Sequence, residues 1–444
     1  MSMRIIFAIL ISLSISFIGR TQKEFASQVE ELIEQYQEVY GFSGTVKIVA
    51  NNSPLLDKSY GLASRSFQVH NTPETRFSIN SISKTFTAVA ILQLAEQNLI
   101  DLHKPIGEYL PNLETSWKDS VTTHHLLTHS SGLPRESGIQ WYDEKSLWEQ
   151  AKMVEKQELL FNPGSRYEYS NSGIILLGAI LEEVSGEEYH DYIDEHIISP
   201  LKLPNTGVYQ GRRVVENQAT PYRFTPNGME EAQRSKHLGE NAGGGLYSTP
   251  SDLYDFVIAL EEHKLLSESS TDLLFDCHIK TSDGECEGYC WSIKSFGADK
   301  IRFAAGSGYG TKSVIIRSPE SGLFIGIVSN LGTFPILNLL RDLYLTVKGE
   351  QVEPPSSKNL AKPNDYRARL GVYHFDPEVL KKHLMIDKSQ IKLHSFEGKL
   401  FLDDELLVQQ PSGKLTLTYT NELTIDFEDD KMVIEINGNR IVSE

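Results

Sequence analysis

The order of strand-like and helix-like segments is the feature that most constrains how this chain can fold. Residues 44–61 read as a β-hairpin with its turn at Asn51-Asn52, and strand-like runs return only within residues 300–329. The stretch between them is mostly helical and rich in loops. The simplest architecture is therefore one sheet that both ends of a domain complete, with helices on its faces and a helical insertion.

Four helices are predicted from apolar spacing and capping residues. Residues 24–40 carry an apolar stripe at helical spacing, and a second helix should run from Ser81 to about Gln97. A third should begin near Pro250, capped by Thr249 or Ser251. A last helix over residues 335–347 would close the unit.

The C-terminal part of the chain has a different pattern. Apolar and polar residues alternate in residues 415–419, 423–427 and 432–436, and Glu397-Gly398, Ser412-Gly413 and Asn437-Gly438 mark turns in the same part of the chain. This predicts a small antiparallel β-domain with one solvated face. A proline- and serine-rich stretch precedes it. We expect a main domain over residues 21–350, a linker over 351–365 and an accessory β-domain over 366–444.

Residues 1–20 are typical of a secretory signal peptide. Arg4 supplies a positive start, and an apolar run from Ile5 to Ile18 follows. An uncleaved N-terminal anchor is the alternative. With the signal removed we expect no integral membrane span and a periplasmic or secreted protein.

Charge and cysteine content narrow the possible partners. The net charge is −18 without a basic block, which argues against nucleic acid and against an anionic membrane surface. An exported protein could pair two of its three cysteines, Cys277, Cys286 and Cys290, and leave one free.

Ser81-Ile82-Ser83-Lys84 is the strongest candidate for chemistry. Residues three apart share one face of a helix, so the Ser81 hydroxyl and the Lys84 amine would meet. An amine held beside a serine can take its proton and make it a nucleophile. The free N–H groups of a helix start suit a developing oxyanion.

Two further segments carry candidate site residues. Tyr169 could relay a proton near a lysine, and Asn171 offers an amide to a substrate carbonyl. Gly306-Ser307-Gly308 follows a predicted strand and could let a substrate approach its edge. Each pattern alone also fits an ordinary loop or turn.

Other catalytic schemes find little support. No serine lies in a G-x-S-x-G elbow. His125 and His129 are four residues apart, but no H-E-x-x-H surrounds them, so we expect no metal site and no cofactor.

Several longer segments occur in a characteristic order. They are Leu126–Leu133 (L-L-T-H-S-S-G-L), Pro163–Asn171 (P-G-S-R-Y-E-Y-S-N), Pro200–Gly207 (P-L-K-L-P-N-T-G) and Ala242–Asp252 (A-G-G-G-L-Y-S-T-P-S-D). Together with S-x-x-K they resemble the serine β-lactamase and penicillin-binding-protein superfamily, in its class-C-like branch. The resemblance covers roughly residues 30 to 345. It implies an α+β fold in which an antiparallel sheet is flanked by helices, plus a helical subdomain.

The resemblance also implies roles for individual residues. Ser81 would be the acylated nucleophile, Lys84 its activator and Tyr169 the general base. Asn171 would hold the substrate amide. The backbone N–H groups of Ser81 and Tyr309 would form the oxyanion hole.

The third motif departs from the family pattern. The family places Lys or His at its first position, where this chain has Gly306 in Gly306-Ser307-Gly308, and the nearest basic residue is Lys312. We therefore expect weaker recognition of substrate carboxylates.

The function that follows is an exported serine hydrolase acting on an amide, ester or β-lactam bond of a small or peptide-like substrate. β-Lactamase, D,D-carboxypeptidase or D-aminopeptidase, and esterase activity stay open. The rival reading is a non-catalytic penicillin-binding-like protein that senses or binds cell-wall fragments. The oligomeric state is not predicted.

Overall fold

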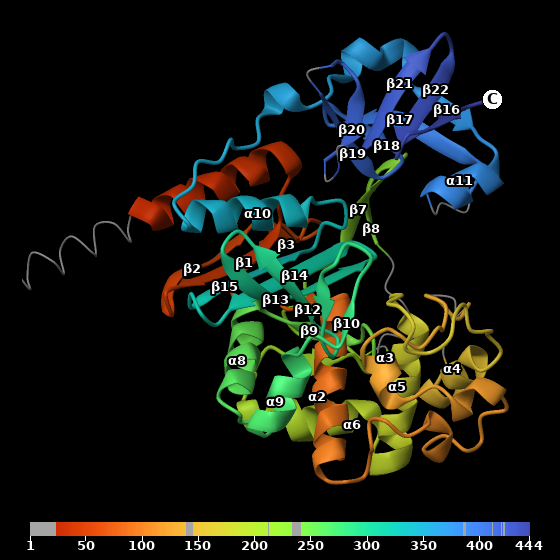
Figure 1. The fold of residues 1–444 in the computed structure, drawn as a ribbon. Coiled ribbons are helices and arrows are strands. Elements are labelled where there is room, and N and C mark those ends of the chain that lie inside the picture. The colour runs from red at the N-terminus through yellow and green to blue at the C-terminus, as the bar shows by residue number, and fades with distance from the viewer. Residues whose placement is uncertain are drawn as a thin grey trace, which may run out of the picture. The chain divides into compact units, whose positions relative to one another are not determined.

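The fold is described from a computed structural model, which describes residues 24–138, 145–211, 213–232, 241–384, 388–410, 412–418, 420 and 422–444. The predicted signal segment, residues 1–20, lies outside this part of the chain, as does Tyr419. The chain forms two compact units (Figure 1). Of the described residues, those within 43–220 and 233–330 form one unit, and those within 24–42, 221–232 and 331–444 form the other.

An eight-stranded antiparallel sheet forms the centre of the unit that contains Ser81. Its strand order is β10-β11-β12-β13-β14-β15-β1-β2, so β1 pairs with β15, the last of these strands in the chain, and β2 forms one edge of the sheet. This confirms the predicted sheet built from both ends. The strands are β1 (Gly44–Ala50), β2 (Ser53–Tyr60), β10 (Ile279–Lys280), β11 (Cys286–Glu287), β12 (Ser292–Phe296), β13 (Asp299–Gly308), β14 (Thr311–Ser318) and β15 (Leu323–Ser329).

The turn chemistry of the first hairpin is the one that its sequence predicted. Asn51 and Asn52 both have positive φ angles, of 52° and 56°, which a tight turn between twisted strands requires and which asparagine tolerates. In β15, the strand that pairs with β1, every residue is buried. A central strand covered on both faces accounts for this uniformly apolar run.

Helices fill the long insertion between β2 and β10. Helix α2 (Ser83–Glu96) is buried on almost all sides and packs against α5, α6 and α9, whereas α8 lies against β15 and β1. The Thr249 hydroxyl caps α8, accepting a hydrogen bond from the Asp252 N–H at 3.2 Å. The other helices are α3 (Thr123–Leu127), α4 (Leu147–Val154), α5 (Asn171–Ser185), α6 (Tyr189–Ile193), α7 (Ser199–Leu201), α8 (Pro250–Glu261) and α9 (Glu268–Phe275).

Two small sheets complete this unit. β5 (Phe77–Ser78) and β6 (Gly207–Val208) both pair with β9 (Leu246–Ser248). A separate hairpin joins β3 (Leu62–Ser64) and β4 (Val69–His70). The three-stranded sheet matters for the site, because β5 ends two residues before Asn80 and therefore anchors the approach to Ser81.

The second unit contains the C-terminal sheet. Eight strands follow one another in chain order, as the predicted antiparallel meander requires. They are β16 (Gly371–His374), β17 (Gln390–Phe396), β18 (Lys399–Leu402), β19 (Glu405–Gln409), β20 (Leu415–Leu417), β21 (Leu423–Glu428), β22 (Lys431–Ile436) and β23 (Asn439–Val442). Helix α11 (Pro377–Leu384) lies between the first two.

The remaining elements of this unit are helical or hairpin segments. They are the predicted helix over residues 24–40, α10 (Ile336–Val347) and the hairpin of β7 (Tyr222–Thr225) and β8 (Gly228–Glu231). Phe224 of the hairpin packs against Phe401 with ring centroids 4.5 Å apart. Ala361, inside the predicted linker, is fully buried in the core of the C-terminal sheet. The domain boundaries at residues 350 and 366 stay a prediction.

No helix in the described part of the chain is both long enough and apolar enough to cross a membrane.

Candidate active site

A 3-10 turn over Asn80–Ile82 leads directly into α2 and carries Ser81. Asn80 has a positive φ of 48°, and its side-chain amide donates a hydrogen bond to the Thr311 hydroxyl of β14 at 3.0 Å. On the helix side, the Ser83 hydroxyl accepts a hydrogen bond from the Leu246 N–H at 3.1 Å. Strands on both sides thus hold the start of the helix in one position.

Lys84 lies on the same face as Ser81, as the S-x-x-K spacing predicted. Its amine donates one hydrogen bond to Ser81 Oγ at 2.9 Å and another to the Gly243 carbonyl oxygen at 2.7 Å. The side chain is 3% exposed. Gly243 belongs to the glycine run before β9, and a Cβ there would lie 3.2 Å from the Lys84 amine. A side chain at Gly243 would therefore crowd the lysine amine.

Tyr169 reaches the same serine from a different segment. Its hydroxyl donates a hydrogen bond to Ser81 Oγ at 3.0 Å. The serine oxygen therefore accepts hydrogen bonds from both groups that the sequence singled out. Two cations lie near the Tyr169 ring, with Lys84 Nζ 5.2 Å and Arg135 Cζ 4.9 Å from its centroid.

The start of α5 positions Tyr169 and Asn171. The intervening Ser170 caps the helix, since its hydroxyl accepts a hydrogen bond from the Gly173 N–H at 3.1 Å. Asn171 is the first helical residue, and its side-chain amide donates a 2.6 Å hydrogen bond to Glu136 Oε1. The cap thus determines where two of the predicted site residues lie.

His129 supports this arrangement and was not assigned a role from the sequence. Its Nδ1 accepts a hydrogen bond from the Ser170 N–H at 3.2 Å, and its ring centroid lies 4.6 Å from that of Tyr169. Burial, together with the charge of Lys84, lowers the pKa of His129 to about 3, so the imidazole is neutral. His125 likewise accepts a backbone hydrogen bond, from Thr122 N–H. Each histidine therefore accepts a hydrogen bond from the backbone N–H of a residue that caps the start of a helix.

The third motif lies at the end of β13. Beyond Phe303, the described strands pair with β13 only on its β14 side, which leaves residues 304–308 with one free edge. A Cβ at Gly306 would overlap the Ile79 carbonyl oxygen, and one at Gly308 would overlap the Asn80 side chain. These glycines therefore allow the segment before Ser81 to lie against the strand.

Lys312 does not take the place of the missing basic residue. It pairs with Ser307 across the hairpin, next to the pair formed by Gly306 and Ser313. The Ser313 hydroxyl donates a hydrogen bond to the Ile79 carbonyl oxygen at 2.7 Å. Side chains alternate along a strand, and Ser313 points toward Ile79. Lys312 therefore projects from the face of the sheet opposite to Ser313.

A pocket of about 180 Å³ opens at Ser81. Asn171 and Ser307 line it together with the serine, so three segments of the sequence prediction converge there. Gly308 lies against Asn80, and Tyr309 is an exposed residue of the following turn. The other residues that line the pocket are Asn80, Glu136, Ser137, Gln150, Ile175, Asn241, Gly243 and Gly244.

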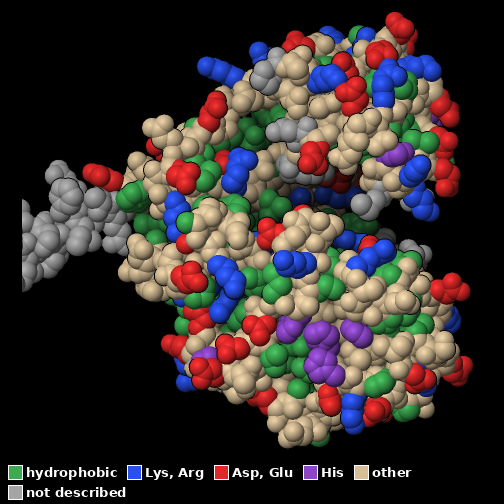
Figure 2. Space-filling model, in the orientation of Figure 1, with side chains coloured by type: hydrophobic (Ala, Val, Ile, Leu, Met, Phe, Trp, Pro, Cys, Tyr) green, Lys and Arg blue, Asp and Glu red, His purple; other side chains and the backbone are tan. Residues whose placement is uncertain are grey.

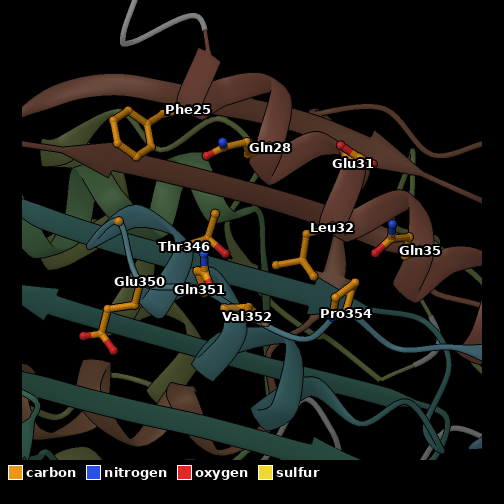
Figure 3. A pocket seen from close by; sticks show the side chains of 11 residues that line it. Phe25, Gln28, Glu31, Leu32, Gln35, Thr346, Glu350, Gln351, Val352 and Pro354 are labelled. Carbon is orange, nitrogen blue, oxygen red and sulfur yellow. The ribbon is translucent and has the colours of Figure 1, made fainter.

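A larger pocket, of about 550 Å³, lies in the other unit between residues 25–35 and residues 346–354 (Figure 3). Phe25 and Leu32 give it an apolar part, and Glu31 and Glu350 give it an acidic part. It brings together no nucleophile and base, so size alone does not locate the chemistry.

Histidines gather on one face of the unit that contains Ser81 (Figure 2). The His124 ring lies within 6 Å of three others, those of His103, His125 and His278. Burial, with the charges of His278, His103 and His125, lowers the pKa of His124 to about 4. A different group, Glu187, Glu195 and His196, brings three potential metal-ligand atoms within 4.8 Å of one another. It shares no residue with the Ser81 pocket.

The cysteines divide as one pair and one single residue. Cys277 and Cys286 form a disulfide, and Cys290 is a free thiol. Burial raises the pKa of Cys290 to about 12, so the thiol stays protonated and is a poor nucleophile.

The chain is similar in sequence and fold to known proteins. A family model described as Beta-lactamase matches residues 29–343. PbpX of Bacillus subtilis (strain 168), named as a penicillin-binding protein, is 30% identical over 261 residues, which are 58% of this chain and 66% of that protein. The teichoic acid D-alanine hydrolase of Staphylococcus aureus is 29% identical over 243 residues, or 54% of this chain and 60% of that protein. The matches span less than two thirds of the length of either relative.

A solved structure extends the likeness to nearly the whole fold. The octameric penicillin-binding protein homologue from Pyrococcus abyssi has a TM-score of 0.67 and 22% identity, covering 94% of this chain and 99% of that one. At this identity the likeness concerns the fold. Because the family model spans well over half of the 444 residues, the chain belongs to the beta-lactamase family.

Proposed function

We propose that this chain is an exported serine hydrolase that cleaves an amide, ester or β-lactam bond through an acyl-enzyme on Ser81. The observation that carries the proposal is the pair of hydrogen bonds that Ser81 Oγ accepts, from Lys84 at 2.9 Å and from Tyr169 at 3.0 Å. A nucleophile needs a base within hydrogen-bond reach, and here two groups meet that requirement.

In the first half of the reaction, Ser81 Oγ bonds to the acyl carbon and gives its proton to the Tyr169–Lys84 pair, which acts as the general base. The carbonyl electron pair moves onto its oxygen, where the N–H groups of Ser81 and Tyr309 are proposed to stabilise the charge. When the carbonyl re-forms, the bond to the leaving group breaks, and the leaving oxygen or nitrogen takes the proton from the pair.

In the second half, a water molecule gives a proton to the same pair while its oxygen bonds to the acyl carbon. Ser81 then leaves and regains a proton. One water is consumed for each bond cleaved, and the protons balance without a redox step. Asn171, which lines the same pocket, is proposed to hold the substrate amide.

The missing positive charge at Gly306 guides the choice of substrate. Without a cation at this point we propose that carboxylate-bearing β-lactams are poor substrates and that an ester or amide is preferred. The name of the Staphylococcus aureus relative, a teichoic acid D-alanine hydrolase, supports this direction. Rapid turnover of nitrocefin without hydrolysis of a short-chain p-nitrophenyl ester would contradict it.

The decisive experiment is intact-mass analysis after treatment with a fluorophosphonate and, separately, with penicillin. The wild type should gain the mass of one adduct, and Ser81→Ala should gain none while keeping its melting temperature. The periplasmic or secreted location would be tested by fractionation and N-terminal sequencing of the mature chain.

A second candidate function is a non-catalytic binder of cell-wall fragments. Gly306, which replaces a basic residue of the family pattern, favours it. Saturable binding of such a fragment, with no adduct under either probe, would support the binder against the enzyme.

A further inference from the structure

Glu136 brings a negative charge to the pocket of the proposed nucleophile. Of the described residues that line the Ser81 pocket, it is the one with a charged side chain. It lies in the loop after Leu133 rather than in any of the family-like segments, and nothing in its sequence context marked it as a site residue.

The carboxylate is held in place but not neutralised. Its Oε1 accepts the hydrogen bond from the Asn171 amide at 2.6 Å, and Oε2 takes no part in that contact. The neighbouring Arg135 has its Nε 3.7 Å from the same Oε1, and both side chains are about two-thirds exposed. An exposed pair at this separation contributes little, so a ligand cation can compete for the carboxylate.

Among the described residues, Arg135 is the cation that pairs with Glu136, and the other nearby lysines have other positions or partners. The Lys84 amine is buried and donates to Ser81 Oγ and the Gly243 carbonyl. Lys312 projects from the other face of the sheet, and Gly306 has no side chain. The pocket therefore attracts a positive group beside Glu136 and disfavours a negative one.

We propose that Glu136 binds the ammonium group of the substrate, which makes the substrate an aminoacyl ester or amide with a free, protonated α-amino group. An ammonium has three donors, and the carboxylate of Glu136 and the amide oxygen of Asn171 are two acceptors side by side. The α-nitrogen of an aminoacyl group lies two bonds from the acyl carbon that Ser81 would attack. One pocket of about 180 Å³ can therefore hold both contacts.

The inference rests on the proposed function, since Ser81 must react for selectivity to be measured. The test compares two substrates that differ only in charge: the p-nitrophenyl ester of D-alanine and its N-acetyl derivative. Glu136→Gln is the informative variant. The side-chain oxygen of this glutamine can still accept the hydrogen bond from Asn171. The variant therefore removes the charge of Glu136 but keeps its structural contact.

For the wild type we expect kcat/KM to be at least about tenfold higher for the free-amine ester, from one charge-assisted hydrogen bond. Glu136→Gln should lower that value about tenfold and leave the N-acetyl ester unchanged. The preference of the wild type should also shrink as salt is added, because the carboxylate is exposed. The matched control is Glu168→Gln, an exposed carboxylate beside Tyr169 that does not line the pocket.

The failures are distinguishable. If the wild type hydrolyses both esters equally, or if Glu136→Gln lowers both rates by the same factor, the ammonium site is wrong and the hydrolase stands. If no ester is cleaved and no probe labels Ser81, the hydrolase is wrong and the ammonium site falls with it.

Discussion

The Lys84 amine lies 2.9 Å from the Ser81 hydroxyl oxygen across the point where a 3-10 turn becomes helix α2. Replacing Lys84 with Met keeps the stem and removes the amine. We expect acylation by a fluorophosphonate to slow about a hundredfold or more. Because the Gly243 carbonyl loses a donor, the free energy of unfolding should also fall by about 1–3 kcal/mol. Stopped-flow labelling and thermal melts measure the two effects.

The control for this prediction is Lys104→Met, which removes an exposed lysine paired with Glu108. It should change neither quantity. Labelling of Lys84→Met at the wild-type rate would contradict the proposed role of the amine.

Tyr169→Phe separates the hydroxyl from the ring. The ring contacts with His129 and Arg135 survive, so the free energy of unfolding should drop by no more than about 1 kcal/mol. The hydrogen bond to Ser81 is lost, and kcat for the ester should fall about a hundredfold. Tyr109→Phe is the control, because the Tyr109 hydroxyl contacts only the backbone of Asp101 in the hydrogen bonds described for it. An unchanged kcat in Tyr169→Phe would remove the tyrosine from the mechanism.

Gly306→Ala tests whether strand β13 holds Ser81, the proposed nucleophile, in position. The added methyl group would overlap the backbone oxygen of Ile79, which must move and carry Ser81 with it. We expect a loss of activity of about tenfold or more, since small displacements of a reacting group are costly. Gly371→Ala is the matched control, because its Cβ would meet no atom within 4 Å. Equal activity of the two variants would show that the close contact between Gly306 and Ile79 is not needed for activity.

His124 should make the protein less stable in acid. Its pKa of about 4 in the folded chain lies below the value of about 6.5 for an unfolded histidine, so the unfolded chain binds the proton first as the pH falls. Stability contributed by neutral His124 is complete above about pH 6.5 and is lost progressively down to about pH 4. Melting temperatures of wild type and His124→Gln across this window should show a shallower slope for the variant. Parallel slopes would contradict the assignment.

The sequence predicted those parts of the fold and site that depend on local patterns. The turn at Asn51-Asn52, the cap at Thr249 and the S-x-x-K face follow from backbone preferences and helical spacing, and all are present. His129, Glu136 and Gly243 were missed as partners of Tyr169, Asn171 and Lys84, because such contacts depend on where distant loops meet. The glycine run before β9 was a visible signal for Gly243, whereas Glu136 had none.

The strand order β14-β15-β1-β2 has a consequence for folding during synthesis. A ribosome makes the helix that carries Ser81 long before it makes β15, the strand that joins the first hairpin to the rest of the sheet. Until β15 is made, one edge of β1 has unpaired backbone N–H and C=O groups. The strands β13 and β14, which hold the segment before Ser81, are also still missing during most of this time. The Ser81 site can therefore form only after the C-terminal strands of this sheet have been made, which predicts slow folding and a long exposure of an open strand edge to chaperones.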